Sequence, residues 1–354
     1  MIGAGTSGAV HVIVPADIDD TSRPSGGNTY DRRVIAGMRA AGATVAQVAV
    51  AGRWPRPSVP ERGALQRTLA ALPTGSAVLI DGLVACGVPD VVVPQSRRLE
   101  IVVLVHLPLG DEVGAADLAD RERETLHAAA AVVATSPWTA QRLREKHDLG
   151  SVDVVTPGVD PAPSAVGTDG VGRLLCVGSV TPTKGQDLLV EALAHVADRS
   201  WSCDLVGPLG RAPAHVADVR AAITRYGLDG RIRMPGALVG APLAAAFAAA
   251  DLLVLPSRVE AFGMVVTEAS ARGIPVLATD VGGVRSALGG AGLLVPTADV
   301  PALSMGLIRW FDRPDLRTEL RAGAQARRTE LTGWEVTSRC LITILDRARS
   351  GTPA

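Results

Sequence analysis

Short apolar runs alternate with helix-like segments along almost the whole of this chain of 354 residues. The runs Val10–Val14 and Ile101–Val105 have the length and composition of buried strands, and the spacing of Tyr30, Val34 and Met38 predicts one face of a helix. A regular strand–helix–strand order favours a parallel sheet, because each crossover helix packs against one of its faces. The alternation therefore predicts an α/β fold with doubly wound, parallel sheets.

One interruption divides this alternation into two halves. Asp160–Gly172 reads DPAPSAVGTDGVG, and a segment so rich in Pro and Gly is typical of a linker. We therefore predict two Rossmann-like domains facing a central cleft, where ligands of such folds bind. The predicted parts are an N-terminal acceptor-side domain at 1–160, a linker at 161–172, a C-terminal domain at 173–333 and a final helix within 334–354.

Composition and terminal pattern exclude several classes of protein. Lys and Arg total 35 against 36 Asp and Glu, which leaves no basic excess for nucleic acid. The 4 cysteines are far apart and lack a C-x-x-C pair, which predicts reduced thiols and no zinc site. We see no signal peptide and no apolar run of ~18 residues, and expect a cytoplasmic protein. Gly3–Gly8 matches G-x-G-x-x-G, but no strand precedes it, which argues against a dinucleotide site.

Two acids lie between two predicted buried strands. Glu260 and Glu268 follow the apolar run Leu252–Leu255 and precede the run Ile274–Ala278. Burying a carboxylate without a partner is costly, so each acid needs a compensating group or a place in a cleft. Carboxylates accept hydrogen bonds, which suits the hydroxyls of a sugar or a ribose.

A predicted helix over Met264–Arg272 contains the second acid. The helix follows a loop with Gly263, and the free N–H groups at its start favour an anion. An alternative remains open: both acids are exposed, or they pair with Arg258 and Arg272.

Lys184 is one of only two lysines in the chain, the other being Lys146. It follows a glycine-led loop after a predicted strand and stands at the start of a predicted helix from Gln186. The helix dipole disfavours a cation there unless an anion is shared, and a phosphate would satisfy the lysine and the helix N–H groups together. The alternative is a solvated surface lysine.

Two weaker signals lie in the N-terminal half. Gly26 and Gly27 end a polar loop before a helix, where they could approach a diphosphate or an acceptor. His106 ends a predicted strand and would point into the cleft of a parallel sheet, although a lone histidine is more often a packing residue. We assign no chemistry to the other histidines, and expect His147 and His215 at the surface.

Together these motifs resemble a known family. The stretch PSRVEAFGMVVTEASARGIPVLATDVGG, with Glu260 and Glu268 as an E-x7-E pair, is similar to the signature of retaining glycosyltransferases of family four, which have the GT-B fold. The Gly26–Gly27 loop, His106, Thr156–Asp160 and the VGSVTPTKG loop occur in the family's order over nearly the whole chain. The resemblance also implies that the final helix crosses back onto the N-terminal domain.

The resemblance implies roles for individual residues. Glu260 would lie beside the transferred sugar, Lys184 would neutralise the diphosphate leaving group, and His106 would touch the sugar, so these three are the predicted catalytic residues. Other residues would hold the ribose, phosphates, sugar and base of a nucleotide sugar. They are Glu268, Gly26, Gly27, Ser179, Arg258, Phe262, Gly263, Met264, Val265, Gly282, Gly283, Met234 and Pro235.

The chain departs from the family pattern at one position. Ser179 stands where the family's phosphate loop often has an arginine, so one diphosphate cation is missing or supplied by Arg258 or Arg173. A lost charge-assisted contact is worth about 1.5–3 kcal/mol, which affects donor affinity and not the fold.

The implied reaction is a hexosyltransferase-type transfer with retention. The donor would be a nucleoside-diphosphate sugar, with UDP- or GDP-sugars as first choices, and the acceptor a hydroxyl of a small molecule, a saccharide or a lipid-linked compound. We predict no cofactor, no metal ion and no nucleic acid. Weak peripheral membrane contact through Arg32, Arg33 and Arg39 of a helix predicted at Thr29–Ala41 is a further alternative, but the apolar face of this helix is better explained as core. The alternatives are another GT-B enzyme, such as an epimerase or phosphorylase, and a non-catalytic sugar-nucleotide-binding protein.

Overall fold

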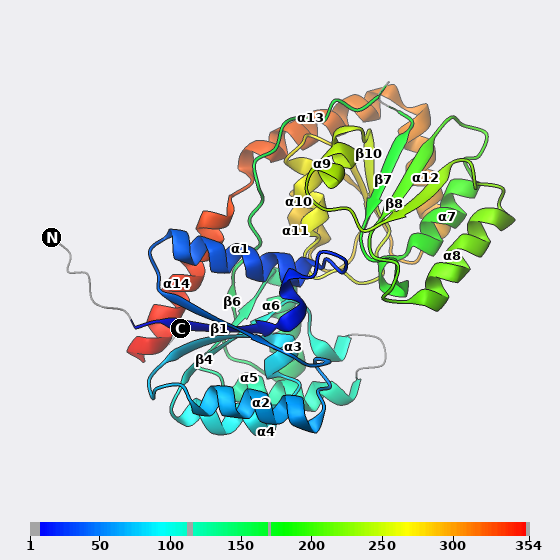
Figure 1. Ribbon diagram of the computed structural model, residues 1–354. Helices are drawn as coiled ribbons and strands as arrows, with labels where there is room; N and C mark the ends of the chain where they lie inside the picture. Colours follow the sequence, from blue (N-terminus) through cyan, green and yellow to red (C-terminus); the bar gives the residue numbers. More distant parts are fainter. Residues whose placement is uncertain (1–7, 112–115, 169–170, 352–354) are drawn as a thin grey trace. The chain divides into compact units, whose positions relative to one another are not determined.

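The computed structural model describes residues 8–111, 116–168 and 171–351 (Figure 1). All but the last residue of the Gly3–Gly8 match therefore lies outside the described residues. The chain forms two compact units. The N-terminal unit contains Met1–Asp19, Gly26–Gly158 and Trp334–Ala354, and the C-terminal unit contains Asp20–Ser25 and Val159–Gly333.

The N-terminal unit is built on a six-stranded parallel sheet in the order β2-β1-β3-β4-β5-β6. Its strands are β1 (Val10–Pro15), β2 (Val45–Val50), β3 (Ala77–Asp81), β4 (Glu100–Val105), β5 (Ala131–Ala134) and β6 (Asp153–Val154). Its helices are α1 (Gly26–Ala40), α2 (Val59–Ala70), α3 (Gly82–Ala85), α4 (Pro89–Val92), α5 (Ala119–Ala128), α6 (Pro137–His147) and α14 (Trp334–Ser350). The carboxyl ends of the parallel strands share one edge of the sheet, so side chains that follow β3 and β4 can meet there.

Helices cover both faces of this sheet. Helices α2, α4, α5 and α6 form a core with one face, while α1 and α14 pack together on the other, with α14 against β3 and β4. Gly37 makes the α1–α14 contact close, because a Cβ there would lie 2.1 Å from the Ser338 hydroxyl. The last helix of the chain therefore belongs to the N-terminal unit.

The buried side of α1 bears on the alternative of membrane contact. Val34 and Met38 on α1 are fully buried. The apolar side of the helix is thus part of the core, and the alternative of weak membrane contact rests on its arginines alone. None of the helices in the described ranges combines the length and hydropathy needed to span a bilayer.

The C-terminal unit repeats the plan with a six-stranded parallel sheet in the order β12-β11-β10-β7-β8-β9. Its strands are β7 (Arg173–Val177), β8 (Ser202–Val206), β9 (Ile232–Gly236), β10 (Leu252–Leu255), β11 (Val276–Thr279) and β12 (Leu293–Val295). Helices α7 (Gln186–Ala194), α8 (Pro213–Arg225) and α12 (Val300–Asp312) share a core with one face, together with α13 (Pro314–Glu330). Helices α9 (Ala241–Ala248), α10 (Met264–Ser270) and α11 (Val284–Leu288) pack on the other face. The predicted fold class, α/β with two parallel sheets, is confirmed.

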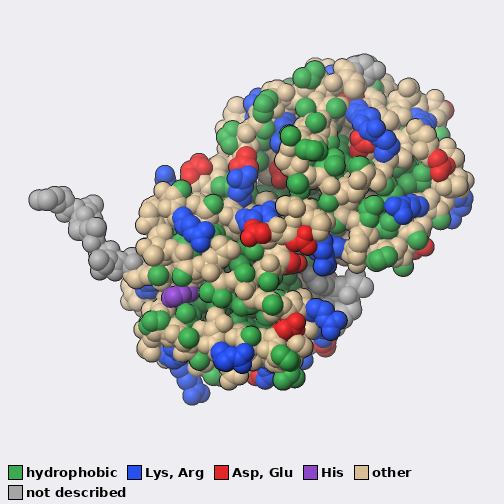
Figure 2. Space-filling model, viewed as in Figure 1, with side chains coloured by type: hydrophobic (Ala, Val, Ile, Leu, Met, Phe, Trp, Pro, Cys, Tyr) green, Lys and Arg blue, Asp and Glu red, His purple; other side chains and the backbone are tan. Residues whose placement is uncertain are grey.

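The sequence pattern predicted some helix ends correctly and missed other helices. At α6, Ser136 accepts a hydrogen bond from the Thr139 N–H at 3.0 Å, as its position before Pro137 predicts. The helix expected from Thr29 begins earlier, at Gly26, and α2, α12 and α13 were not predicted. On the face of the molecule drawn in Figure 2, basic and acidic side chains are interspersed, as the balanced composition leads one to expect.

Candidate functional site

The lysine loop of the C-terminal unit follows β7. The chain runs through Gly178 and Ser179 into a short 3-10 turn that ends at Lys184, and then into α7. Gly185 has a φ of +68°, and a Cβ there would lie 2.1 Å from the carbonyl oxygen of Pro256. Only glycine allows this approach, so Gly185 brings the lysine loop against the loop that follows β10.

Lys184 and Glu260 meet where these two loops touch. The Lys184 ammonium lies 2.5 Å from the Glu260 carboxylate, and the Ser257 hydroxyl lies 3.3 Å from the same oxygen. Their side chains are 30% and 12% exposed, so the pair is partly shielded from water but open to a ligand. The carboxylate that needed a partner therefore has one in Lys184, which lies 76 positions away in sequence.

Arg258 ties the same two loops together. Its guanidinium donates two hydrogen bonds to Asp187, at 2.9 and 2.6 Å, and one to the Pro182 carbonyl at 2.7 Å. Its backbone N–H donates to the Thr183 carbonyl at 2.8 Å. The hydrogen bonds to Asp187 raise the pKa of Arg258. Arg258 thus has a carboxylate partner in place, and its predicted contact with a diphosphate stays a prediction.

Arg173 lies at the wrong end of β7 to replace the missing arginine. It is the first residue of the strand, roughly 13 Å from Val177 at ~3.3 Å per residue. Its guanidinium pairs with Asp204 at 2.6 Å. Arg173 and Asp204 line a cavity of about 490 Å³ together with Arg233, Met234 and Pro235. Met234 and Pro235, which were predicted to lie near the base of the nucleotide, therefore line a cavity. Arg173, which was considered for the diphosphate, lines the same cavity.

The second acid, Glu268, lies on α10 and is partly buried. Arg272 donates a hydrogen bond to the Glu268 backbone carbonyl at 2.7 Å and packs over the Phe247 ring. Burial lowers the pKa of Arg272, and the nearby Glu268 carboxylate opposes that change. Arg272 therefore contacts the backbone of Glu268, and its expected pairing with the carboxylate stays an open alternative.

The glycines after β11 have a steric reason to be glycine. A Cβ on Gly282, where φ is +58°, would lie 1.6 Å from the Glu260 carbonyl oxygen, and one on Gly283 would lie 2.3 Å from the Ala261 carbonyl oxygen. The Gly283 N–H donates to the Glu260 carbonyl at 3.2 Å. The loop with Gly282 and Gly283 therefore packs directly against the loop with Glu260 and helps to set its position. Phe262 is buried nearby, and Gly263, at φ +92°, is the N-cap residue of α10, whose first residues are Met264 and Val265.

His106 lies in a polar group at the carboxyl ends of β3 and β4. Its Nε2 lies 3.0 Å from Asp31 Oδ1 and 3.7 Å from Asp81 Oδ2. The two glycines predicted from the sequence fall in the first turn of α1, and a Cβ on Gly27 would lie 3.1 Å from the imidazole ring. Asp31 and Asp81 were not predicted. The signals that could have found them are the position of Asp81 at the end of a strand and of Asp31 shortly after a glycine pair.

Asp31, Asp81 and His106 are also the group in the described residues that could hold a metal ion, since one atom from each lies within 4.8 Å of the others. The absence of a metal stays a prediction. The contacts of His106 and of the other predicted donor-binding residues with a nucleotide sugar also stay predictions.

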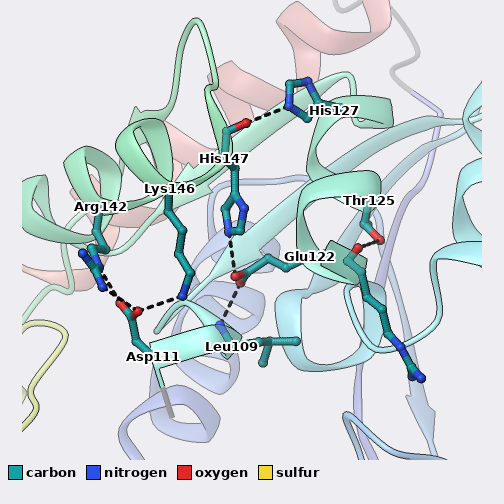
Figure 3. A network of polar contacts seen from close by, with 9 residues as sticks. Leu109, Asp111, Glu122, Thr125, His127, Arg142, Lys146 and His147 are labelled. Carbon is teal, nitrogen blue, oxygen red and sulfur yellow. Dashed lines mark hydrogen bonds and ion pairs between the residues drawn. The ribbon is translucent and has the colours of Figure 1, made fainter. Parts of the chain in front are cut away.

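A second polar network fixes the chain just after His106 (Figure 3). The Glu122 carboxylate accepts the Leu109 N–H at 2.8 Å and contacts His147 Nε2 at 2.8 Å. Lys146 lies 2.9 Å from Asp111, which also holds Arg142. The expectation that His147 lies at the surface is wrong, because the residue is 1% exposed. The sequence could not show this, since its partner Glu122 lies on a different helix. Residues 112–115, which follow Asp111, lie outside the described ones.

Comparison with known proteins identifies a domain and several relatives of this chain. Residues 172–313 match the family of glycosyl transferases group 1. The D-inositol 3-phosphate glycosyltransferase of Kineococcus radiotolerans is 33% identical over 64% of this chain and 59% of its own length. That of Thermobispora bispora is 31% identical over 74% of this chain and 66% of its own length. The chain thus spans less than two thirds of the length of these relatives.

Solved structures share the fold over nearly the full chain. Sucrose-phosphate synthase from Thermosynechococcus elongatus superposes with a TM-score of 0.83 at 20% identity, covering 97% of this chain and all of that one. Anabaena Alr3699/HepE in complex with UDP-glucose gives a TM-score of 0.77 at 19% identity, covering 96% and 99%. Residues 172–313 therefore form a group 1 glycosyltransferase domain, and the chain has the GT-B fold.

Proposed function

We propose that this protein is a retaining glycosyltransferase that moves a sugar from a nucleoside-diphosphate sugar to a hydroxyl acceptor. The observation that carries the proposal is the partly exposed Lys184–Glu260 pair at the loops after β7 and β10 of a group 1 glycosyltransferase domain. A diphosphate would replace the carboxylate as the partner of Lys184, and Glu260 would then accept hydrogen bonds from sugar hydroxyls.

The chemistry asked of these groups is mainly electrostatic. The bond from the sugar C1 to the diphosphate oxygen breaks, and a bond from C1 to the acceptor oxygen forms on the same face. The departing phosphate oxygen takes the acceptor's proton. Lys184 would stabilise the negative charge that develops on the leaving group, and a preformed cation in a partly shielded site is effective in this role.

The comparisons suggest which compounds to try first. Anabaena Alr3699/HepE binds UDP-glucose, so UDP-glucose is the first donor, followed by GDP-sugars. The curated relatives are named for D-inositol 3-phosphate, which makes it the first acceptor. The acceptor is the less supported half of the proposal, because the chain spans only part of those relatives.

The test is turnover with the two lysines compared. Purified protein is incubated with each nucleotide sugar and acceptor, release of the nucleoside diphosphate is followed, and the product's anomeric configuration is read by NMR. We expect retention, with turnover lost in Lys184→Met and kept in Lys146→Met, whose lysine pairs with Asp111 elsewhere.

Other outcomes distinguish the alternatives. Inversion would refute the same-face mechanism. An isomerised nucleotide sugar would indicate an epimerase, and binding without turnover across a broad acceptor panel would indicate a non-catalytic sugar-nucleotide-binding protein.

A further inference from the structure

Three ionisable side chains, Asp31, Asp81 and His106, lie together in the N-terminal unit. The family resemblance implies a role for His106 but not for the two acids. Asp31 comes from the first turns of α1, Asp81 from the end of β3 and His106 from the end of β4. Asp31 is 2% exposed and Asp81 is 4% exposed, so both carboxyl groups are shielded from water. The His106 side chain is 20% exposed and is therefore the member that a ligand can reach.

The charges of this group do not balance unless extra protons are present. Asp81 Oδ1 accepts the Leu83 N–H at 2.6 Å, and Asp31 Oδ1 contacts the imidazole at 3.0 Å. Asp31 Oδ2 is buried and has no hydrogen-bond partner among the described residues. Two ionised carboxylates beside a neutral imidazole would leave two uncompensated charges in a buried site, which is strongly unfavourable.

The imidazole is also held in position by its neighbours. Gly27 leaves room for the ring, and the edge of the Tyr30 ring meets it with 5.2 Å between centroids. Thr135 donates a hydrogen bond to the His106 carbonyl at 3.3 Å. Because Nε2 faces the buried carboxylates, Nδ1 is the ring nitrogen that has no partner among the described residues.

We propose that Asp31, Asp81 and His106 form a proton-sharing triad in which one carboxyl group keeps its proton and His106 is an imidazolium at neutral pH. Nε2–H donates to Asp31, and Nδ1–H is left as a fixed donor for an oxygen atom of a ligand. Asp31 and Asp81 are then positioning residues that set the charge and orientation of His106. The proposal concerns the free protein and goes beyond the proposed transferase activity.

The titration directions agree with this arrangement. Burial and the neighbouring Asp31 raise the pKa of Asp81 to about 7, so it holds a proton where carboxyl groups usually do not. Burial lowers the pKa of His106, but Asp31 and Asp81 outweigh burial and raise it. The other groups that face the triad are Tyr30 from α1 and Cys86 after α3, and burial raises the pKa of both, so neither carries charge at neutral pH.

A bound divalent cation is the competing explanation for the same three groups. A cation held by the three groups would compensate the same buried charges as the extra protons. The experiment distinguishes the two.

The test reads His106 directly, in the full chain and without substrate. The six histidines are labelled with ¹⁵N, His106 is assigned by its loss in His106→Gln, and the ring nitrogen shifts are followed from pH 5 to 9. We expect imidazolium shifts at pH 7 and a pKa above the usual 6.5. In Asp31→Asn the pKa of His106 should fall below that of the wild type, because Asp31 raises it, while Asp90→Asn, an exposed acid paired with Arg62, should leave it unchanged.

Two results would overturn the proposal, and the wild type alone can give either. A neutral His106 ring at pH 7 in metal-free protein is the first. The second is an imidazolium signal that appears only after chelation and is removed by Zn²⁺ or Mn²⁺, which would make the group a cation site. Signals of the other histidines report whether each variant remains folded, so loss of fold cannot be mistaken for loss of the triad.

Discussion

A methyl group at position 282 should displace Glu260 in the candidate donor site. In Gly282→Ala the new Cβ would lie 1.6 Å from the Glu260 carbonyl oxygen, whereas real Cβ contacts essentially never fall below 3.0 Å. The two loops must therefore separate by at least about 1.4 Å. Glu260 is bonded to Lys184 at 2.5 Å, so a movement of this size breaks that contact or moves the lysine loop with it.

The magnitude can be worked out against a matched glycine. Gly227 has a φ of +67°, close to the +58° of Gly282, but a Cβ added there would have no other atom within 4 Å. Gly227→Ala should cost only the left-handed backbone strain, about 1–2 kcal/mol. Gly282→Ala adds the lost Gly283–Glu260 hydrogen bond, worth about 0.5–1.5 kcal/mol, and a loop shift. We expect a total of about 2–4 kcal/mol and at least a tenfold loss of donor affinity, since misplacement by ~1 Å at such sites is costly.

The assay is urea unfolding of both variants, with nucleotide-sugar titration by calorimetry. Gly282→Ala should lose more stability than Gly227→Ala, and only Gly282→Ala should lose donor affinity. Equal destabilisation and unchanged affinity in both would refute the idea that this glycine loop sets the position of Glu260.

Two further predictions concern the N-terminal unit. Because the pKa of Asp81 is raised to about 7, the folded state holds more protons than the unfolded state between pH ~4 and ~7, and stability is lost as pH rises through that window, on the order of 4 kcal/mol in total. The raised pKa of His106 acts in the same direction, so chemical denaturation at pH 5 and 8.5 should show a decline for wild type and a smaller one for Asp81→Asn; an identical slope would contradict the raised pKa. Glu122→Ala leaves His147 and the Leu109 N–H without their partner and should cost ~3–5 kcal/mol in urea unfolding. Asp117→Ala, which breaks only the exposed pair with Arg56, should leave the stability almost unchanged. Similar losses in both would show that the buried pair adds nothing.

The sequence predicted the sheets because their signal is local. Runs such as Ile101–Val105 are continuously apolar, as strands buried on both faces of a parallel sheet must be. Helices with few buried side chains gave a weaker signal: α2 buries only Leu65 and Leu69, and it was missed. Its start is marked by Glu61, whose carboxylate accepts the Ser58 N–H at 2.6 Å, a short-range pattern that could have been used.

Pairings between distant residues could not be predicted. Asp31 lies in the polar run Tyr30–Arg33 and looks like part of a solvated helix face, but its partner His106 is 75 positions away. The hydroxyls of a ligand were expected to compensate Glu260, but its partner in the structure is Lys184, which is equally remote in sequence. The pattern of a sequence shows that a charge needs compensation, but only the fold shows which residue provides it.

The most direct test of the proposed function is donor binding to the C-terminal unit's site within the full chain. Thermal shift would be measured with UDP-, GDP-, ADP- and TDP-sugars on wild type, Lys184→Met, Glu268→Gln and the control Lys146→Met. We predict that one nucleotide raises the Tm of wild type and Lys146→Met, and has little effect on the other two. Equal stabilisation of all four proteins, or no shift with any nucleotide, would contradict the assignment of Lys184 and Glu268 to a nucleotide-sugar site.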